Sequence, residues 1–478
     1  MGTEPLQGAL TALQSCLSKN KFIGGCCGEI MVKDWATSSS NFLKRLADRI
    51  CLQAQWFEYK LSHALYKPFE HCLGYISVLP GAFSAYSWAA LSADDHRVLK
   101  AYFKPFIAPQ QLTWVESNVY FLAEDRIMSE EIVKIREKGY RLAFVKQAKA
   151  TTEGAPGLIH LINQRRRWIN GAWFSLIKVA LMTDMTKHVR ESGHGKVRTV
   201  LLTLEIYYLQ VLIAFTWVAV GAYYLAFSIT LRKLLPFDSN AATPSLNAYL
   251  FYISKAIYLF LLLLTFIISL SLNPKRGSWY WYSLLLFWLL LSLFLSLSIF
   301  SFVVTLSFES TYSMAALCAS VGAVGLALVV YFEDWVYVAA CFPFYVLMMP
   351  VYVNILSVYA ICKTDDLTWG TRRTSSESSP DSLSFHFARL KSLYLLIFLL
   401  FNVVFSGVFE ALDRNNLSKY LEILYGVSFC VLLCPVLGSV AYSVIRAVNH
   451  RTDQVEFEEN MTKLKQLPEY AEDQTVLE

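Results

Sequence analysis

Three consecutive arginines between a glutamine and a tryptophan form the most unusual chemistry-bearing stretch of this 478-residue chain. Residues 164–168 read Gln-Arg-Arg-Arg-Trp and interrupt an apolar run of helical length, residues 157–174. If the run is helical, Gln164 and Arg165 lie on the same side as Trp168, because neighbours three and four apart face each other. Arginine binds phosphate through its fork of donors, and an indole suits the apolar face of a sugar ring. A basic collar that anchors an interfacial helix to anionic lipid is the alternative interpretation.

An acidic doublet lies upstream of the arginines, where residues 122–126 read Leu-Ala-Glu-Asp-Arg. Glu124 and Asp125 introduce an amphipathic pattern, and Asp is a preferred N-cap residue. Glu130 and Glu131 would then complement the positive end of the helix. From these residues alone, helix capping is the favoured interpretation.

The two motifs together, in this order, resemble chitin synthase, a processive family 2 glycosyltransferase embedded in the membrane. The resemblance implies that Asp125 is the general base, with Glu124 and Arg126 setting its position and charge. A carboxylate suits this role because the acceptor hydroxyl must lose its proton as it attacks the anomeric carbon. The resemblance also implies a set of residues that bind the diphosphate and the acceptor sugar: Gln164, Arg165, Arg166, Arg167 and Trp168.

Further stretches follow the same family pattern. Residues 22–32 predict a short buried strand pair with a glycine turn, and residues 55–60 open an amphipathic helix. Residues 78–88 predict a strand broken at its Pro-Gly pair, and they resemble the family segment beside the acceptor sugar and the channel mouth. Ser87 stands where the family usually has Arg. The resemblance places four residues at the channel mouth: Pro80, Gly81, Ser84 and Tyr86.

Composition indicates a polytopic membrane protein, because 55% of the residues are hydrophobic and only 17% are charged. The net charge of +5 is too small to indicate nucleic acid, and the basic residues between 138 and 198 are typical of a membrane surface. The ten cysteines have no metal-binding spacing. Residues 1–20 lack the apolar core of a signal peptide, so we expect the amino-terminal part to be cytosolic.

Long apolar runs dominate the second half of the chain and predict membrane helices. Glu205 is costly in lipid and should face protein, water or the sugar path, whereas Lys255 can snorkel to the interface. The runs cover residues 199–230, 249–272, 282–307, 314–332, 336–362, 390–412 and 420–448.

The predicted fold class is α/β plus α-helical membrane: the C-terminal half of a family A glycosyltransferase domain, interfacial amphipathic helices and a polytopic transmembrane helix bundle. The predicted boundaries are 1–153 for a partial cytosolic glycosyltransferase domain, 154–198 for interfacial helices with the arginine motif, 199–362 for transmembrane helices, 363–389 for a polar loop, 390–448 for two transmembrane helices and 449–478 for a polar acidic tail.

The polar loop carries a further family signature at Trp369, Gly370, Thr371 and Arg372. Five full spans from the cytosol would place this loop outside, yet its basic residues favour the inside. We expect that one run does not cross as a simple span. The candidates are residues 199–230, which contain Glu205, and residues 336–362, which contain two prolines.

The resemblance implies transfer of N-acetylglucosamine from UDP-N-acetylglucosamine to a growing β-1,4 chitin chain with inversion, followed by extrusion of the polymer. Magnesium or manganese would bridge the diphosphate, but the family's metal-associated Asp would precede Met1, so this chain offers no metal ligand. We therefore expect a truncated chain, inactive by itself, in the plasma membrane. The expected partners are the nucleotide sugar, the chitin chain and the lipid bilayer, with a homodimer left open and nucleic acid not expected.

Two other classes remain open. A related hyaluronan or cellulose synthase shares the Asp and the Gln-x-x-Arg-Trp pattern, although the remaining motifs favour chitin. A non-catalytic membrane subunit fits the composition and would require the motifs to be relics.

A cysteine that replaces Ser376 tests the predicted sidedness of the polar loop. We expect an impermeant thiol reagent to leave Ser376→Cys unlabelled in intact cells and to label it after permeabilisation, because the neighbouring Arg372 and Arg373 favour the cytosol. Labelling from outside intact cells would show that the loop is external and that all five runs cross.

Overall fold

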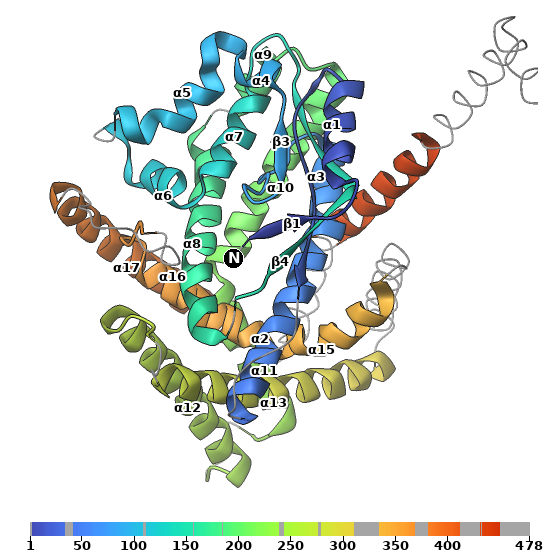
Figure 1. Cartoon of the computed structure of the whole chain (residues 1–478). Helices are drawn as coiled ribbons and strands as arrows, with labels where there is room; N and C mark the ends of the chain where they lie inside the picture. The colour runs from blue at the N-terminus through green and yellow to red at the C-terminus, as the bar shows by residue number, and fades with distance from the viewer. Residues whose placement is uncertain are drawn as a thin grey trace, which may run out of the picture.

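Long apolar helices lie below a part that contains a sheet and its covering helices (Figure 1). The computed structural model describes residues 2–33, 42–108, 111–155, 157–183, 185–238, 243–275, 279–309, 334–368, 381–411, 431 and 433–449.

Four strands form one mixed sheet in the order β1-β4-β2-β3. Strand β2 runs parallel to β4, whereas β1 pairs with β4 and β3 pairs with β2 in antiparallel fashion. The strands are β1 (Thr3–Pro5), β2 (Ile23–Lys33), β3 (Ser84–Tyr86) and β4 (Arg141–Glu153).

Strand β2 corrects the prediction of a strand pair with a glycine turn. It is one continuous strand whose register against β4 shifts near Gly25 and again after Gly28. Glycine at position 28 allows β2 to approach its neighbours closely. A Cβ at Gly28 would lie 2.3 Å from the carbonyl oxygen of Ala148 and 2.3 Å from the ring of Phe83. A side chain at this position would therefore separate β2 from its neighbours.

The helices of the upper part connect and cover these strands. The sequence predicts that a helix begins at Gln55, but the observed helix α2 begins earlier, at Phe42. These elements are α1 (Ala9–Lys19), α2 (Phe42–Leu61), η1 (Ser62–Tyr66), α3 (Lys67–Leu73), α4 (Trp88–Leu91), α5 (Ala93–Ile107), α6 (Trp114–Leu122), α7 (Glu124–Val133), α8 (Leu158–Ile177), η3 (Lys178–Met182) and α9 (Met185–Glu191).

The apolar run 199–230 folds as two helices, α10 (Lys196–Trp217) and α11 (Ala219–Leu234), that separate at Val218. Helix α10 buries Leu202, Ile206 and Leu209 in the same hydrophobic cluster as Leu142 and Phe144 of β4. Figure 1 accordingly shows α10 beside the sheet, whereas α12 and α13 lie below it. The run is therefore not a single straight helix.

Four described helical segments have the length and apolarity of membrane spans: Lys196–Trp217, Leu246–Ser271, Trp335–Cys362 and Arg389–Ala411. They include or belong to α10, α12 (Leu246–Ser271), α15 (Trp335–Val351), η5 (Tyr352–Ser357), α16 (Val358–Cys362) and α17 (Asp381–Ala411). Helix α13 (Trp279–Glu309) and the helix Leu433–Asn449 are also apolar. The predicted run 314–332 lies outside the described residues, as do residues 420–430 and 432 of the run 420–448 and the signature 369–372.

Lys255, expected to be able to snorkel, forms an ion pair in this helical part. Its ammonium donates to Glu410 over 2.7 Å, and Ser228 donates to the same carboxylate over 2.8 Å. Helices α11, α12 and α17 are thereby linked by one polar contact.

A matched pair of helical glycines tests how closely α8 approaches the start of α7. A Cβ at Gly171 would lie 2.6 Å from the Cβ of Ala123, whereas a Cβ at Gly407 meets nothing within 4 Å. We expect Gly171→Ala to cost about 1–3 kcal/mol through overpacking. Gly407→Ala should not destabilise, because Ala favours a helix over Gly by about 1 kcal/mol. Thermal unfolding in detergent checks this, and an unchanged melting temperature for Gly171→Ala would contradict the close approach.

Candidate active site

Asp125 lies in the first turn of α7, where a loop from another part of the chain meets it. Helix α7 begins at Glu124 after Ala123, so the capping interpretation of Asp125 is wrong. The Gly81 amide donates to the Asp125 carboxylate over 3.2 Å. The Leu79 amide donates to the Ser129 hydroxyl over 3.1 Å. The predicted channel-mouth segment is therefore attached to the helix that carries the candidate base.

The charge of Asp125 acts on two tyrosines, Tyr86 of β3 and Tyr102 of α5. Burial raises the pKa of Tyr86, and the Asp125 charge acts in the same direction although a hydrogen bond with Ser84 opposes it. Burial also raises the pKa of Tyr102, assisted by Glu124 and then by Asp125. Of the four residues predicted at the channel mouth, the structure brings Gly81 into contact with the candidate base.

Buried ion pairs fix the C-terminal half of α7. Glu130 accepts from Lys134 and, over 2.6 Å, from Lys178, while Glu131 accepts from Arg97 over 2.8 Å. Burial would raise the pKa of Glu131, but Lys134 and Arg97 hold it at about 2. These carboxylates lie in the C-terminal half of α7, so they do not complement its positive end as predicted. They connect α7 to α5 and to η3.

Helix α8 presents Gln164, Trp168 and Gly171 at helical spacing along one face. Gly171 meets Ala123 directly before α7, so this face points toward the start of the helix that carries Asp125. The Arg165 guanidinium lies 4.4 Å from the ring centroid of Trp168, and the Tyr59 ring lies 5.9 Å from it. The guanidinium covers one face of the indole, so a sugar would have to use the other.

Arg165 is buried and paired with an acid of α2. Its Nη1 lies 2.5 Å from Oε1 of Glu58, whose other oxygen accepts from the Tyr352 hydroxyl over 2.8 Å. Burial of the neighbouring Tyr59 raises its pKa to about 12. Arg165 therefore contacts protein and the indole, and its predicted contact with the diphosphate lacks support from this geometry.

The Arg166 guanidinium also makes its hydrogen bonds within the protein, on another side of α8. It is 1% exposed, donates to the backbone carbonyls of Asp366 and Thr368, and forms a 3.1 Å ion pair with Asp366. Asn170, one turn later, donates to the Ala360 carbonyl over 2.8 Å. This geometry anchors the segment that follows α16, which differs from the predicted role in diphosphate binding. Gln164, Arg167 and Trp168 are half-buried.

Residues 55–59 position α8, a role that sequence reasoning missed. Gln55 accepts from the Ala155 amide over 2.9 Å and donates to the Ala155 carbonyl over 3.2 Å. Together with Glu58 and Tyr59, it places one turn of α2 against both the start and the middle of α8. The available signal was the spacing of these three residues on one helix face, which was interpreted only as a family match.

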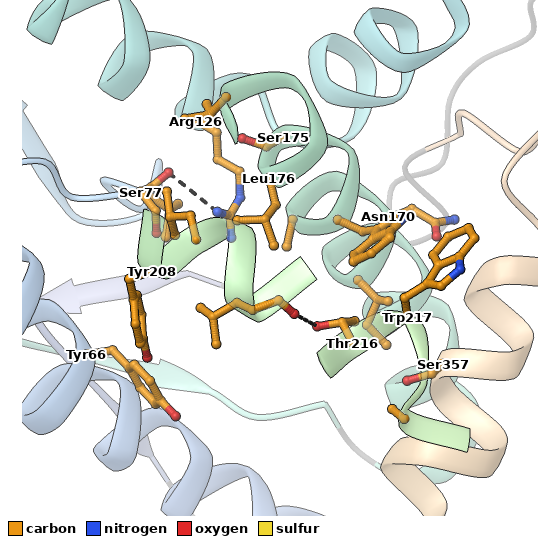
Figure 2. Close-up of a pocket in the computed structure, with 18 of the residues that line it drawn as sticks. Tyr66, Ser77, Arg126, Asn170, Ser175, Leu176, Tyr208, Thr216, Trp217 and Ser357 are labelled. Atoms are coloured by element: carbon orange, nitrogen blue, oxygen red, sulfur yellow. Dashed lines mark hydrogen bonds between the residues drawn. The ribbon is translucent and has the colours of Figure 1, made fainter. Parts of the chain in front are cut away.

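A cavity of about 460 Å³ lies between α8, α10 and α17, and Arg126, the residue that follows the candidate base, lines it. Arg126 and Ser77 line one side, where the guanidinium donates to the Ser77 carbonyl over 3.5 Å, and Trp217 and Ser357 line the other (Figure 2). Its volume lies within the range of about 300–1,000 Å³ that is typical of ligand sites. The aromatic side chains in its wall include Tyr66, Tyr75, Trp173, Tyr208, Trp217 and Tyr394.

The described residues do not provide a metal centre. They contain no cluster of three or more His, Cys, Asp or Glu side chains that could hold an ion. Glu124 and Asp125 alone give two carboxylates, and Mg²⁺ usually completes its shell with water and substrate phosphates.

The buried pair of Glu58 and Arg165 yields a stability prediction. Glu58→Gln leaves a buried guanidinium without its counter-charge, so we expect the protein to unfold at lower temperature in detergent. The loss should stay below the roughly 3–5 kcal/mol of a fully buried pair, because the Glu58 side chain is 30% exposed. Glu4→Gln is the matched control, since its pair with Lys33 is largely exposed. Equal melting temperatures for both variants would contradict the proposed contribution of the pair.

Comparison with known proteins identifies the domain that carries this site. Residues 1–183 match the chitin synthase-like glycosyltransferase domain. Chitin synthase 2 of Cryptococcus neoformans var. grubii is 33% identical over 401 residues, which cover 79% of this chain and 41% of that protein. Chitin synthase 1 of Mycosarcoma maydis is 32% identical over 399 residues, covering 78% and 42%. Chitin synthase C of Aspergillus oryzae is 29% identical over 395 residues, covering 78% and 41%.

The chain spans less than half of the length of these curated relatives. The similarity nevertheless extends well beyond the matched domain into the apolar helices, since it covers more than three quarters of the chain. The sequence-based resemblance is therefore confirmed: residues 1–183 belong to the chitin synthase-like glycosyltransferase domain family, and the chain as a whole is related to chitin synthases.

Proposed function

We propose that this chain forms the acceptor side and the membrane part of a chitin synthase. The enzyme would transfer N-acetylglucosamine from UDP-N-acetylglucosamine to a growing β-1,4 chain with inversion and extrude the polymer. The observation that carries this proposal is the contact of the Gly81 loop with Asp125, in the helix whose next residue, Arg126, lines an aromatic cavity. The related proteins support it by name and by the matched domain.

The residues around Asp125 suit a general base. The Gly81 amide orients one carboxylate oxygen, and the other would accept the proton of the acceptor hydroxyl as that oxygen attacks the anomeric carbon. Arg126, the next residue of α7, donates to the Ser77 carbonyl and so fixes the segment that contains Ser77. Trp168 would stack on the acceptor sugar with the indole face that Arg165 leaves open.

The cavity supports a path for the product. It starts at Arg126 and Ser77, next to the candidate base, and continues between helices that are apolar enough to span a membrane. Aromatic side chains in the cavity wall can contact the apolar faces of sugar rings, and such contacts leave the sugars free to move along the path. A sugar that has just been added at Asp125 could therefore move into this space.

The remaining expectations belong to the same proposal. Magnesium or manganese would act on the diphosphate, and the family A fold would complete the nucleotide site. The transferase part and residues 369–372 would face the cytosol at the plasma membrane, and a homodimer remains open. A hyaluronan or cellulose synthase is the competing enzyme, which digestion of the product by hyaluronidase or cellulase instead of chitinase would reveal. A non-catalytic subunit would not bind UDP.

Asp125→Asn tests the proposed base in a form of the protein that synthesises polymer. We expect incorporation of labelled N-acetylglucosamine into chitinase-sensitive polymer to fall at least about a hundredfold, because a positioned base contributes about 10²–10⁴-fold. Affinity for UDP should stay nearly unchanged, since the base acts on the acceptor.

Asp95→Asn is the matched control, because its carboxylate is exposed and pairs only with Lys100 at the surface. It should leave incorporation near the unmutated level. Incorporation by Asp125→Asn at that same level would remove Asp125 from its role.

A further inference from the structure

The first two turns of α2 present a stripe of exposed side chains. Phe42 is 68% exposed and Leu46 is 45% exposed, and Arg45 and Arg49 are exposed as well. At about 100° per residue, these four side chains lie within roughly 100° of the helix circumference, and we call them the α2 stripe. An exposed stripe that is both apolar and cationic is typical of a helix that lies on a membrane surface.

The charges of the α2 stripe are not neutralised within the described part of the chain. Neither Arg45 nor Arg49 forms an ion pair or a hydrogen bond with a described residue. The first turn of α2 contains no acidic residue. Burial raises the pKa of Asp48, the first acid of the helix, and Lys44 opposes that shift, so this acid already has a cation near it. The two guanidiniums therefore lack an anionic partner among the described residues.

The opposite face of the same turns belongs to the core of the apolar helices. Cys51 is fully buried in one hydrophobic cluster with Trp281 of α13, and Asp48 and Cys51 both act electrostatically on the Tyr282 hydroxyl. Figure 1 likewise shows the start of α2 reaching down to α11 and α13. Trp279, which begins α13, is 74% exposed, and exposed aromatic residues at the end of an apolar helix mark the boundary between membrane and water. The α2 stripe therefore lies near this boundary.

The chemistry of the stripe fits an anionic phospholipid. A guanidinium binds phosphate through two parallel hydrogen bonds, and Arg45 and Arg49 are one helical turn apart, so both can reach one headgroup. Phe42 and Leu46 suit the layer between headgroups and acyl chains, where surface helices bury their apolar face. A free phosphate would use the arginines alone and leave the two apolar side chains in water.

We propose that the α2 stripe is a binding site for an anionic phospholipid, whose phosphate group contacts the two arginines while the two apolar side chains enter the outer part of the acyl layer. This inference goes beyond the proposed function, because it holds whichever sugar is transferred. It also connects the lipid to the candidate active site, since Glu58 of α2 pairs with Arg165 of α8. A lipid bound at the start of α2 would thus stabilise the helix that holds α8 in place.

The test measures binding of a fluorescent phosphatidylglycerol to the 478-residue chain in a nonionic detergent, followed by fluorescence anisotropy. We expect Arg45→Gln with Arg49→Gln to bind about tenfold more weakly or worse, because each basic residue near an anionic lipid surface contributes about fivefold. Arg45→Lys with Arg49→Lys should lose less, since the charge remains although the fork of donors does not. Phe42→Ser with Leu46→Ser should also weaken binding, because the apolar contact is lost. The arginine variants should keep the melting temperature of the unmutated chain, since both side chains are exposed.

Arg136→Gln with Arg190→Gln is the matched control. Both arginines are exposed, and they lie after the end of α7 and in α9, at the opposite end of the view in Figure 1 from the start of α2. The control removes the same charge, so it should bind the lipid like the unmutated chain. An equal loss of affinity in the control would show that only net charge matters and would overturn the proposal. Unchanged affinity in the glutamine variant or in the serine variant of the α2 stripe would do the same.

Two further ligands separate an anionic lipid from other partners. Inorganic phosphate at millimolar concentration should not displace the labelled lipid, and displacement would indicate a general anion site. A fluorescent phosphatidylcholine should bind more weakly, and equal binding would show that the arginines do not select the headgroup. Either contrary result overturns the proposal. The Asp125→Asn result bears on the base alone, so the lipid site stands or falls separately from the proposed function.

Discussion

Two neighbouring arginines on α8 are buried, and each must find acceptors in a different direction. Successive residues of a helix point about 100° apart, so Arg165 and Arg166 cannot share one partner. Arg165 pairs with Glu58 of α2, and Arg166 binds the carbonyls of Asp366 and Thr368 as well as the Asp366 carboxylate. A buried guanidinium without acceptors would be strongly destabilising. The two pairs therefore fix α8 between the transferase part and the segment that follows α16.

The position of α8 determines the rest of the site. Gly171 lets the helix approach Ala123, and so the face that carries Gln164 and Trp168 is aligned with the start of α7. There the Gly81 loop orients the Asp125 carboxylate, and the cavity begins at Arg126. The apolar helices are thus continuous with the transferase part.

Features that depend on residues close together in the sequence could be predicted. The order of the motifs indicated the family, the apolar runs indicated long helices, and Glu205 was correctly expected to avoid lipid. The partners of Arg165 and Arg166 could not be predicted, because Glu58 and Asp366 lie about 100 and 200 residues away in sequence. Glycines of β2 were misinterpreted as a turn, since the close approach of Ala148 and Phe83 exists only in the folded sheet. The division of residues 199–230 at Val218 likewise depends on the packing of α10 against β4.

We propose that one continuous site joins Asp125 to the aromatic cavity, and a structure with a bound chitin oligosaccharide tests this directly. Determination by electron cryomicroscopy should place the terminal sugar with its hydroxyl about 3 Å from the Asp125 carboxylate, within hydrogen-bond reach. The following sugars should enter the cavity past Arg126 and lie against Trp173 and Trp217. An oligosaccharide bound elsewhere, with Asp125 out of reach and the cavity empty, would contradict the account.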